Sequence, residues 1–150
     1  MTRRHDALIP LTHDHHHTLA HARRLEEGAS LTDLSERRRV ADDFVNFYLG
    51  RVLRHFHEEE ELFFAPLVDH EEACDEVMKA VAEHLRIHGL ARVLRRGLVD
   101  GEADPETMKA LSKLLTTHVR SEEKNVFPLV ERLLTSEELT DLATTGRRDV

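Results

Sequence analysis

Residues 45–66 read VNFYLGRVLRHFHEEEELFFAP, and this stretch decides the fold class. Its apolar residues recur at every third or fourth position, which is the period of an α-helix and not of a strand. One helix face then carries Val45, Tyr48, Val52, His55, Glu59, Leu62 and Pro66. Because residues four apart project from the same side of a helix, we predict that His55 and Glu59 point together into an otherwise apolar core.

The same helical period continues through most of the chain. It predicts long helices over about 9–27, from 30–33 to 68, over 71–99 and over 105–134, and a short helix from 135 or 136 to 143. Asp104 suits the N-cap of the last long helix, and Pro105 suits its first position. Short loops make neighbouring helices antiparallel, so we expect an all-α fold, an up-down-up-down four-helix bundle with a short C-terminal helix. Residues 1–150 show no repeat or boundary and are expected to form one domain.

The composition argues against several classes of protein. A net charge of −8 disfavours nucleic acid as the main partner. No run of 18 apolar residues is present, and the first residues lack a signal-peptide core. Cys74 is the single cysteine, so neither an intramolecular disulfide nor a cysteine metal site is expected. We therefore expect a cytoplasmic protein that binds neither nucleic acid nor membranes.

Histidine is unusually common, at 12 of 150 residues. Every predicted long helix places histidine or glutamate at the middle of its apolar face. These residues are His15 on the first helix, followed by the pairs His55/Glu59, His84/His88 and His118/Glu122. At a rise of about 1.5 Å per residue, the three pairs lie at one level of the bundle. The side chains of all seven residues are thus predicted to converge on one region of the interior.

This predicted cluster has the composition of a metal site. Buried ionisable groups need partners, because an unpaired buried charge is very costly. Imidazole and carboxylate ligands in this proportion suit iron, manganese or zinc. A single tetrahedral zinc takes three or four ligands, so five histidines and two glutamates exceed its needs. The set instead fits two adjacent six-coordinate ions that share the carboxylates.

The segments that carry these residues resemble the hemerythrin-like family, also called the HHE cation-binding domain. They are Asp14-His15, HFHEE (residues 55–59), EHLRIH (residues 83–88) and HVRSEE (residues 118–123), in the order of the family. The resemblance implies two iron ions in an Fe–O–Fe centre, with manganese or zinc as other possible metals. It implies that His84, His88 and His118 bind one ion, that His15 and His55 bind the other, and that Glu59 and Glu122 bridge them. The second ion would then keep an open coordination position.

Three ligand positions have rivals with suitable spacing. The rivals are His16 for His15, His57/Glu61 for His55/Glu59, and Glu123 for Glu122. Leucines share the face of His15 and polar residues share the face of His57, which favours His15 and the His55/Glu59 pair. Glu123 stands at the five-residue offset that oxygen-carrying hemerythrins use. The choice between Glu122 and Glu123 therefore bears on whether the protein carries O₂ reversibly.

More than one function is compatible with such a centre. We expect a protein that binds or senses O₂, NO or redox state at the open iron position. The alternative is a di-iron enzyme that acts on peroxide or NO, or an iron donor for cluster repair. A metal-free helical protein would require the histidine and glutamate pattern to be chance. With metal bound, the expected partner is a small diatomic ligand or peroxide.

Overall fold

The computed structural model describes residues 3–149, with side chains through residue 146, and this part of the chain is helical without any strand. The first long rod is α1 (Ile9–Ala29). The second rod consists of α2 (Leu34–Phe47), η1 (Tyr48–Val52), α3 (Leu53–Glu58), η2 (Glu59–Phe64) and η3 (Ala65–Leu67). The third is α4 (Glu71–Val99), and the fourth consists of α5 (Pro105–Ser121), η4 (Glu122–Val126) and α6 (Phe127–Leu133). The all-α prediction is thereby confirmed.

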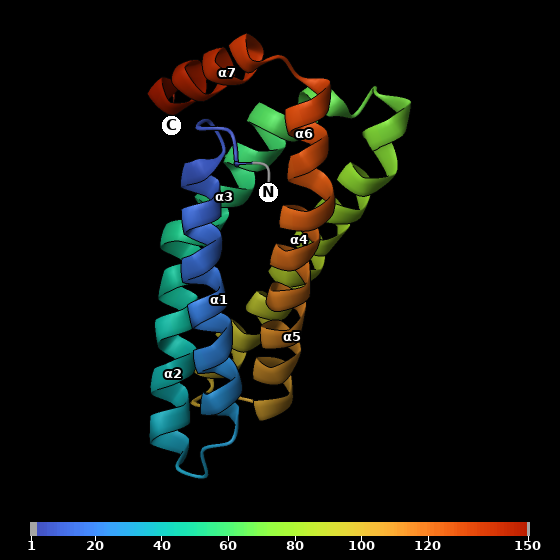
Figure 1. Ribbon diagram of the computed structural model, residues 1–150. Coiled ribbons are helices and arrows are strands. Elements are labelled where there is room, and N and C mark those ends of the chain that lie inside the picture. The colour runs from blue at the N-terminus through green and yellow to red at the C-terminus, as the bar shows by residue number, and fades with distance from the viewer. Residues whose placement is uncertain (1–2, 150) are drawn as a thin grey trace.

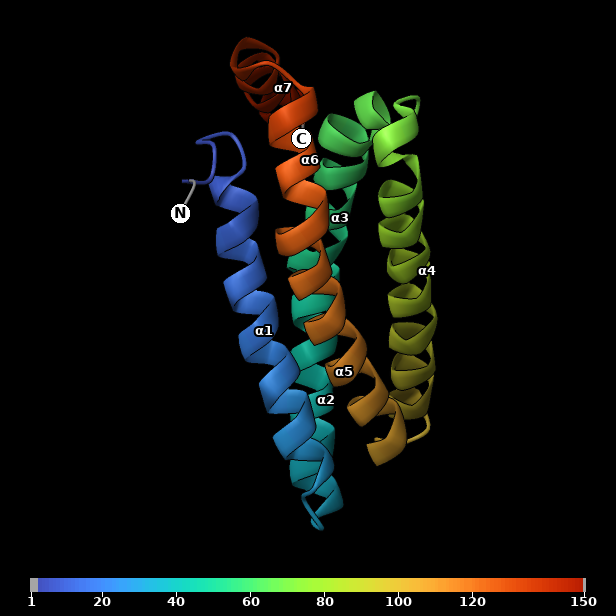
Figure 2. The ribbon, with the colours of Figure 1, turned by 45° about the vertical axis from the view of Figure 1, so that its right-hand side comes forward.

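The four rods lie side by side, and consecutive rods run in opposite directions (Figures 1 and 2). The short connections begin and end at capped helices. Asp33 accepts a hydrogen bond from the backbone N–H of Glu36, and Asp104 accepts one from that of Thr107. Asp104 is therefore the N-cap that the sequence predicts. Gly101, at φ +80°, closes the turn after α4, where a left-handed backbone conformation favours glycine.

Two of the four rods depart from the uninterrupted helices that the sequence suggests. The second and fourth rods contain π-helical turns, in which a backbone N–H bonds to the carbonyl five residues earlier. Two of these turns, η2 and η4, begin at Glu59 and Glu122. The wider turns change the direction in which the side chains leave the helix at both glutamates. Such turns are frequent at functional sites.

The last helix, α7 (Ser136–Asp149), is longer than the predicted one, which ends at residue 143. It lies across one end of the bundle (Figure 1). Leu139, Ala143 and Gly146 are buried on one face of α7 at helical spacing. Gly146 packs so closely on Leu62 that an added Cβ would overlap the leucine side chain. This packing against the bundle explains why the polar C-terminal segment continues as a helix.

Buried apolar residues form two clusters rather than one continuous core. The first cluster, at the α7 end, includes Leu11, Phe63, Phe64, Phe127 and Val130. The second, at the other end, includes Leu25, Phe44, Ile87, Leu94, Met108 and Leu111. Along each of the four rods, the buried histidines and glutamates lie between residues of the two clusters. The fold thus places a polar layer between two apolar ones.

None of the helices within residues 3–149 combines the length and the apolarity that crossing a bilayer requires.

Candidate metal centre

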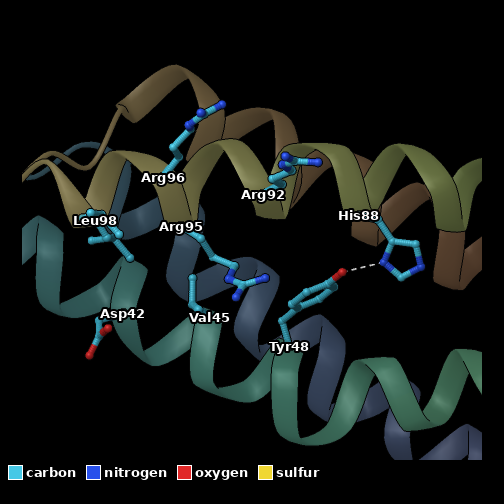
Figure 3. Close-up of a pocket in the computed structure, with 9 residues that line it drawn as sticks. Asp42, Val45, Tyr48, His88, Arg92, Arg95, Arg96 and Leu98 are labelled. Atoms are coloured by element: carbon cyan, nitrogen blue, oxygen red, sulfur yellow. Dashed lines mark hydrogen bonds between the residues drawn. The ribbon is translucent and has the colours of Figure 1, made fainter.

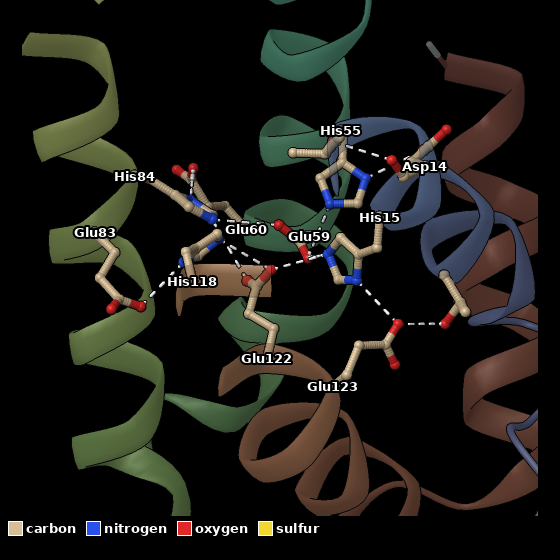
Figure 4. A network of polar contacts seen from close by, with 12 residues as sticks. Asp14, His15, His55, Glu59, Glu60, Glu83, His84, His118, Glu122 and Glu123 are labelled. Carbon is tan, nitrogen blue, oxygen red and sulfur yellow. Dashed lines mark hydrogen bonds and ion pairs between the residues drawn. The ribbon is translucent and has the colours of Figure 1, made fainter. Parts of the chain in front are cut away.

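Six of the seven predicted ligands meet in the polar layer between the apolar clusters. They are His15, His55, Glu59, His84, His118 and Glu122, and each has an exposed fraction of 5 % or less (Figure 4). All four rods contribute, since the residues come from α1, α3, η2, α4, α5 and η4. Side chains far apart in the sequence thus form one buried cluster.

The cluster divides into two overlapping groups, each able to hold a cation. One group consists of His15, His55, Glu59 and Glu122, and the other of His84, His118, Glu59 and Glu122. Within each group the candidate ligand atoms all lie within 4.8 Å of one another. Both glutamates belong to both groups. The two groups are therefore adjacent and share their carboxylates.

The distances show how the carboxylates are shared. Glu122 Oε1 lies 3.1 Å from His15 Nε2 and 3.0 Å from His118 Nε2, and Oε2 of the same residue lies 3.5 Å from His84 Nε2. Glu59 Oε2 lies 3.4 Å from His15 Nε2 and 3.2 Å from His55 Nε2. Its other oxygen lies 3.3 Å from His84 Nε2. The Nε2 atoms of all four imidazoles thus face the two carboxylates.

The other nitrogen of each imidazole faces a second set of carboxylates. His15 Nδ1 lies 2.9 Å from Glu123, His55 Nδ1 lies 3.1 Å from Asp14, His84 Nδ1 lies 2.9 Å from Glu60, and His118 Nδ1 lies 3.0 Å from Glu83. A carboxylate in this position accepts a hydrogen bond from Nδ1–H, which leaves the Nε2 lone pair free for a cation. This is the tautomer that two metal sites in the polar layer would require.

Sequence reasoning missed the roles of these acidic residues, although a signal was available. Each one is adjacent in sequence to a residue of the centre, and each reaches the histidine of a different helix. Asp14 on α1 bonds to α3, and Glu60 on η2 bonds to α4. Glu83 on α4 bonds to α5, and Glu123 on η4 bonds back to α1. The second set of carboxylates therefore closes a ring around the bundle.

The imidazoles and carboxylates of the cluster shift one another's pKa values. Burial by itself lowers the pKa of His84, but Glu122 and Glu59 outweigh burial and raise the pKa to about 10. Burial likewise opposes the charge on His55, and Glu59 and Asp14 raise its pKa to about 9. For Glu122, burial and Glu59 raise the pKa, but the histidines outweigh them and lower it to about 2. Positive charge is therefore stabilised at this point of the interior.

Several buried atoms of the cluster lie at ion-pair distance from one another without the geometry of a hydrogen bond. Among the described residues, no hydrogen-bond partner exists for Nε2 of His55, His84 and His118, for both carboxylate oxygens of Glu59, or for Glu122 Oε2. Leaving a buried polar atom unsatisfied costs about 1–3 kcal/mol, and more for a charged group. All of these atoms point into the space between the imidazoles and the carboxylates. The unsatisfied atoms are those that metal ions would use, so the residues present fit a metal site.

The structure does not bring His88 to the other six residues. Its half-buried ring lies outside both groups, where Nδ1 of His88 is hydrogen-bonded to Oη of Tyr48. Burial and the nearby His84 lower the pKa of His88, which keeps the ring neutral and able to accept this bond. Phe56 lies between the two histidines, stacked on His84 at 3.8 Å and edge-on to His88 at 5.6 Å.

The rival ligand positions lie elsewhere. His16 is exposed on α1. The side chains of His57 and Glu61 are 61 % and 56 % exposed and pair with each other on the surface. Glu123 bonds to Nδ1 of His15, on the far side of that ring from the shared carboxylates, and its oxygens belong to neither group.

The fold and the site together define an all-helical protein whose buried imidazole and carboxylate groups fit a metal site. The family model for the hemerythrin HHE cation-binding domain matches residues 7–130, so the chain belongs to the hemerythrin HHE family. The resemblance noted in the sequence is thereby confirmed. No curated protein and no solved structure gave a match to the chain.

Proposed function

We propose that this protein holds two iron ions in the polar layer and binds O₂ or NO there, as a sensor of these gases or of redox state. The observation that carries the proposal is the pair of buried groups that share Glu59 and Glu122. Family membership supports a cation as the ligand of these groups. Histidine nitrogen and carboxylate oxygen are ligands that iron accepts.

The geometry favours an equal division of the histidines between the two ions. His15 and His55 would hold one ion, and His84 and His118 would hold the other. Glu59 and Glu122 would supply oxygen atoms to both. Each ion then has about four protein donors, fewer than the six that octahedral coordination requires. We therefore expect open coordination positions at both ions. The ligand set implied by the family resemblance, which includes His88, instead predicts an open position at only one of the two ions.

Iron with open coordination positions supplies reversible ligand binding and one-electron chemistry. The protein's own residues would orient the imidazoles and keep water away. The carboxylates of Asp14, Glu60, Glu83 and Glu123 fix the rings through Nδ1. Phe56 stacks on His84 at 3.8 Å, and Phe127 stacks on His15 at 5.3 Å. These aromatic rings cover faces of two imidazoles with apolar surface.

The proposal is tested by elemental analysis of the untagged protein, with the ultraviolet–visible spectrum of the same air-exposed sample. We expect two irons per chain and oxo-bridge bands in the near ultraviolet. The reduced protein should then change its spectrum saturably with O₂ or NO. Absence of bound metal after reconstitution with ferrous iron would overturn the proposal.

The chain offers a matched control for this test. His55→Ala/Glu59→Gln removes a buried pair, and His57→Ala/Glu61→Gln removes a pair with the same spacing on the surface. We expect the first variant to lose iron and the second to keep both ions. Equal iron loss in the two variants would contradict the proposed ligands.

A second function, delivery of iron to a cluster under repair, is favoured by the small number of protein donors to each ion. Ions held by about four donors and open to small ligands exchange more readily than ions in closed sites. Transfer of ferrous iron to a chelator within minutes, with no spectral response to O₂ or NO, would favour delivery. Rapid peroxide or NO consumption would instead favour an enzyme.

A further inference from the structure

A groove of about 820 Å³ lies between the second rod and α4 (Figure 3). Its walls are formed by Asp42, Val45 and Tyr48 on the second rod and by His88, Arg92, Arg95, Arg96, Leu98 and Val99 on α4. The metal-site residues do not line it. The volume is within the range of small-molecule sites, about 300–1,000 Å³.

Three arginines contribute positive charge to this groove, in a chain whose net charge is −8. The guanidinium groups of Arg92, Arg95 and Arg96 form no ion pair or hydrogen bond within the described part of the chain. Figure 3 shows Arg95 reaching from α4 toward Tyr48, whereas Arg96 points away from α2. The charge of Arg95 acts on Tyr48, where it opposes the rise in the tyrosine pKa that burial causes. Arg92 and Arg95 thus contribute positive charge to the groove, and no acidic side chain of the described residues forms an ion pair with them.

Tyr48 and His88 form a hydrogen-bonded pair in the wall of the groove. Tyr48 is buried, with an exposed fraction of 5 %, and its hydroxyl is hydrogen-bonded to Nδ1 of His88. Figure 3 shows the guanidinium group of Arg95 beside the Tyr48 ring. A ligand in the groove would therefore meet a fixed polar pair close to a guanidinium group.

A second hollow adjoins the first and shares Asp42 and Leu98 with it. It is lined by Ser35, Arg38 and Arg39 as well, and the guanidinium groups of both arginines have no ion pair or hydrogen bond in the described residues. Asp42 is the one acidic residue lining either hollow. Positive charge therefore exceeds negative charge along the whole groove, with cations at both ends.

We propose that this groove binds a small phosphate-bearing molecule. Guanidinium groups match the oxygen atoms of phosphate in pairs and stay charged at every physiological pH. Arg92 and Arg95 would bind a phosphate group at the inner end, beside Tyr48. Arg38 and Arg39 would bind a second anionic group, and Val45 and Leu98 would contact an apolar part between them. This site is independent of the proposed iron function.

The test is calorimetric titration of the purified protein with inorganic phosphate, with chloride used to hold the ionic strength constant. Sulfate is the second probe, because it is also a tetrahedral dianion but a weak ligand for iron. We expect both anions to bind saturably at one site. Tyr48 is the only tyrosine and tryptophan is absent, so a parallel change in tyrosine fluorescence reports on the groove itself.

Two variants of equal charge locate the binding. Arg92→Gln/Arg95→Gln should weaken phosphate and sulfate binding at least tenfold. Arg23→Gln/Arg86→Gln removes two exposed arginines that lie outside the groove and should leave binding unchanged. Equal weakening in both variants would show general charge attraction and overturn the proposal. Phosphate binding without sulfate binding would place the anion at the metal centre, and binding of an RNA or DNA oligomer but not of phosphate would indicate a different ligand. Either result would also overturn it.

Discussion

Glu83 on α4 bonds not to its neighbour His84 but to His118 on α5, with Oε1 3.0 Å from Nδ1. Both side chains are buried, at exposed fractions of 7 % for Glu83 and 1 % for His118. The same relationship recurs around the bundle, since an acidic residue beside the centre on one helix fixes the histidine of another. The orientation of each imidazole is therefore set by a contact between helices.

Glu83→Ala should weaken metal binding without removing a direct ligand. Loss of such an outer partner typically costs about 10–100-fold in metal affinity. We expect that loss in a competition titration against a chelator, with two ions per chain still bound at saturating iron. Glu71→Ala, at an exposed position of the same helix, is the control and should leave the affinity unchanged. An unaltered affinity in Glu83→Ala would show that the ring of carboxylates does not support the centre.

Replacement of His88 distinguishes the two possible ligand sets. The structure holds this ring against Tyr48, so His88→Ala should retain two metal ions per chain. His84→Ala, one turn earlier on α4, should lose at least one ion, because Nε2 of His84 faces both Glu59 and Glu122. Elemental analysis of the two variants after identical reconstitution gives the comparison. Loss of an ion from His88→Ala would restore the set that the family resemblance implies.

His88 also shows where reasoning from sequence reached its limit. A period of 3.6 residues rotates positions four apart by about 40°, so His84 and His88 share a face only approximately. Which of them meets the polar layer depends on Phe56, a side chain from another rod that stacks on His84. Hydrophobic periodicity describes one helix at a time and contains no information about such a contact.

Periodicity was sufficient for the helical fold and for most positions of the centre. It predicted the all-helical fold and the residues on each buried face, and six of the seven selected positions lie together. It also separated the buried pair His55/Glu59 from the exposed pair His57/Glu61. The π-helical turns at Glu59 and Glu122 could not be predicted, because no residue pattern distinguishes them from α-helical turns. The acidic ring had a signal, because each of its four carboxylates is adjacent in sequence to a residue of the centre. The histidines that these carboxylates contact depend on how the helices pack, which periodicity does not describe.

Two glycines should respond in opposite ways to the same substitution. A Cβ on Gly28 in α1 would lie 2.6 Å from Val40 Cγ1, whereas one on Gly89 in α4 would meet nothing within 4 Å. Gly28→Ala should therefore destabilise the fold by about 1–3 kcal/mol through overpacking. Gly89→Ala should stabilise it by about 0.5–1 kcal/mol through the better helix propensity of alanine.

Urea unfolding of both variants measures these changes in the free energy of unfolding. The variant Val40→Ala completes a double-mutant cycle with Gly28→Ala. In the double variant Gly28→Ala/Val40→Ala, the cost of the added methyl group should largely disappear, because the clashing side chain is shorter. A cost that persists in the double variant would place the strain in the backbone of α1 and not in the contact with Val40.

The stability of the metal-free protein should fall as the pH rises above neutrality. The pKa values of His84 and His55, about 10 and about 9, lie above the ordinary 6.5. The folded state thus holds these protons more tightly than the unfolded state does. Their contribution is fully present below pH 6.5 and is lost as the pH rises through about 9 to 10. Glu122, with its pKa lowered to about 2 from 4.5, contributes above pH 4.5 and loses this contribution as the pH falls toward 2.

Maximal stability of the metal-free protein is therefore expected between about pH 4.5 and 6.5. Unfolding free energies in urea at pH 5.5, about 7.5 and about 9.5 would measure the decline. The iron-loaded protein is the control, because metal ligation requires neutral imidazoles and should remove the loss over this alkaline range. A metal-free protein that is equally stable at all three pH values would contradict this prediction. It would show that protons do not hold the buried histidines and carboxylates together, and the charge complementarity of the polar layer would need another explanation.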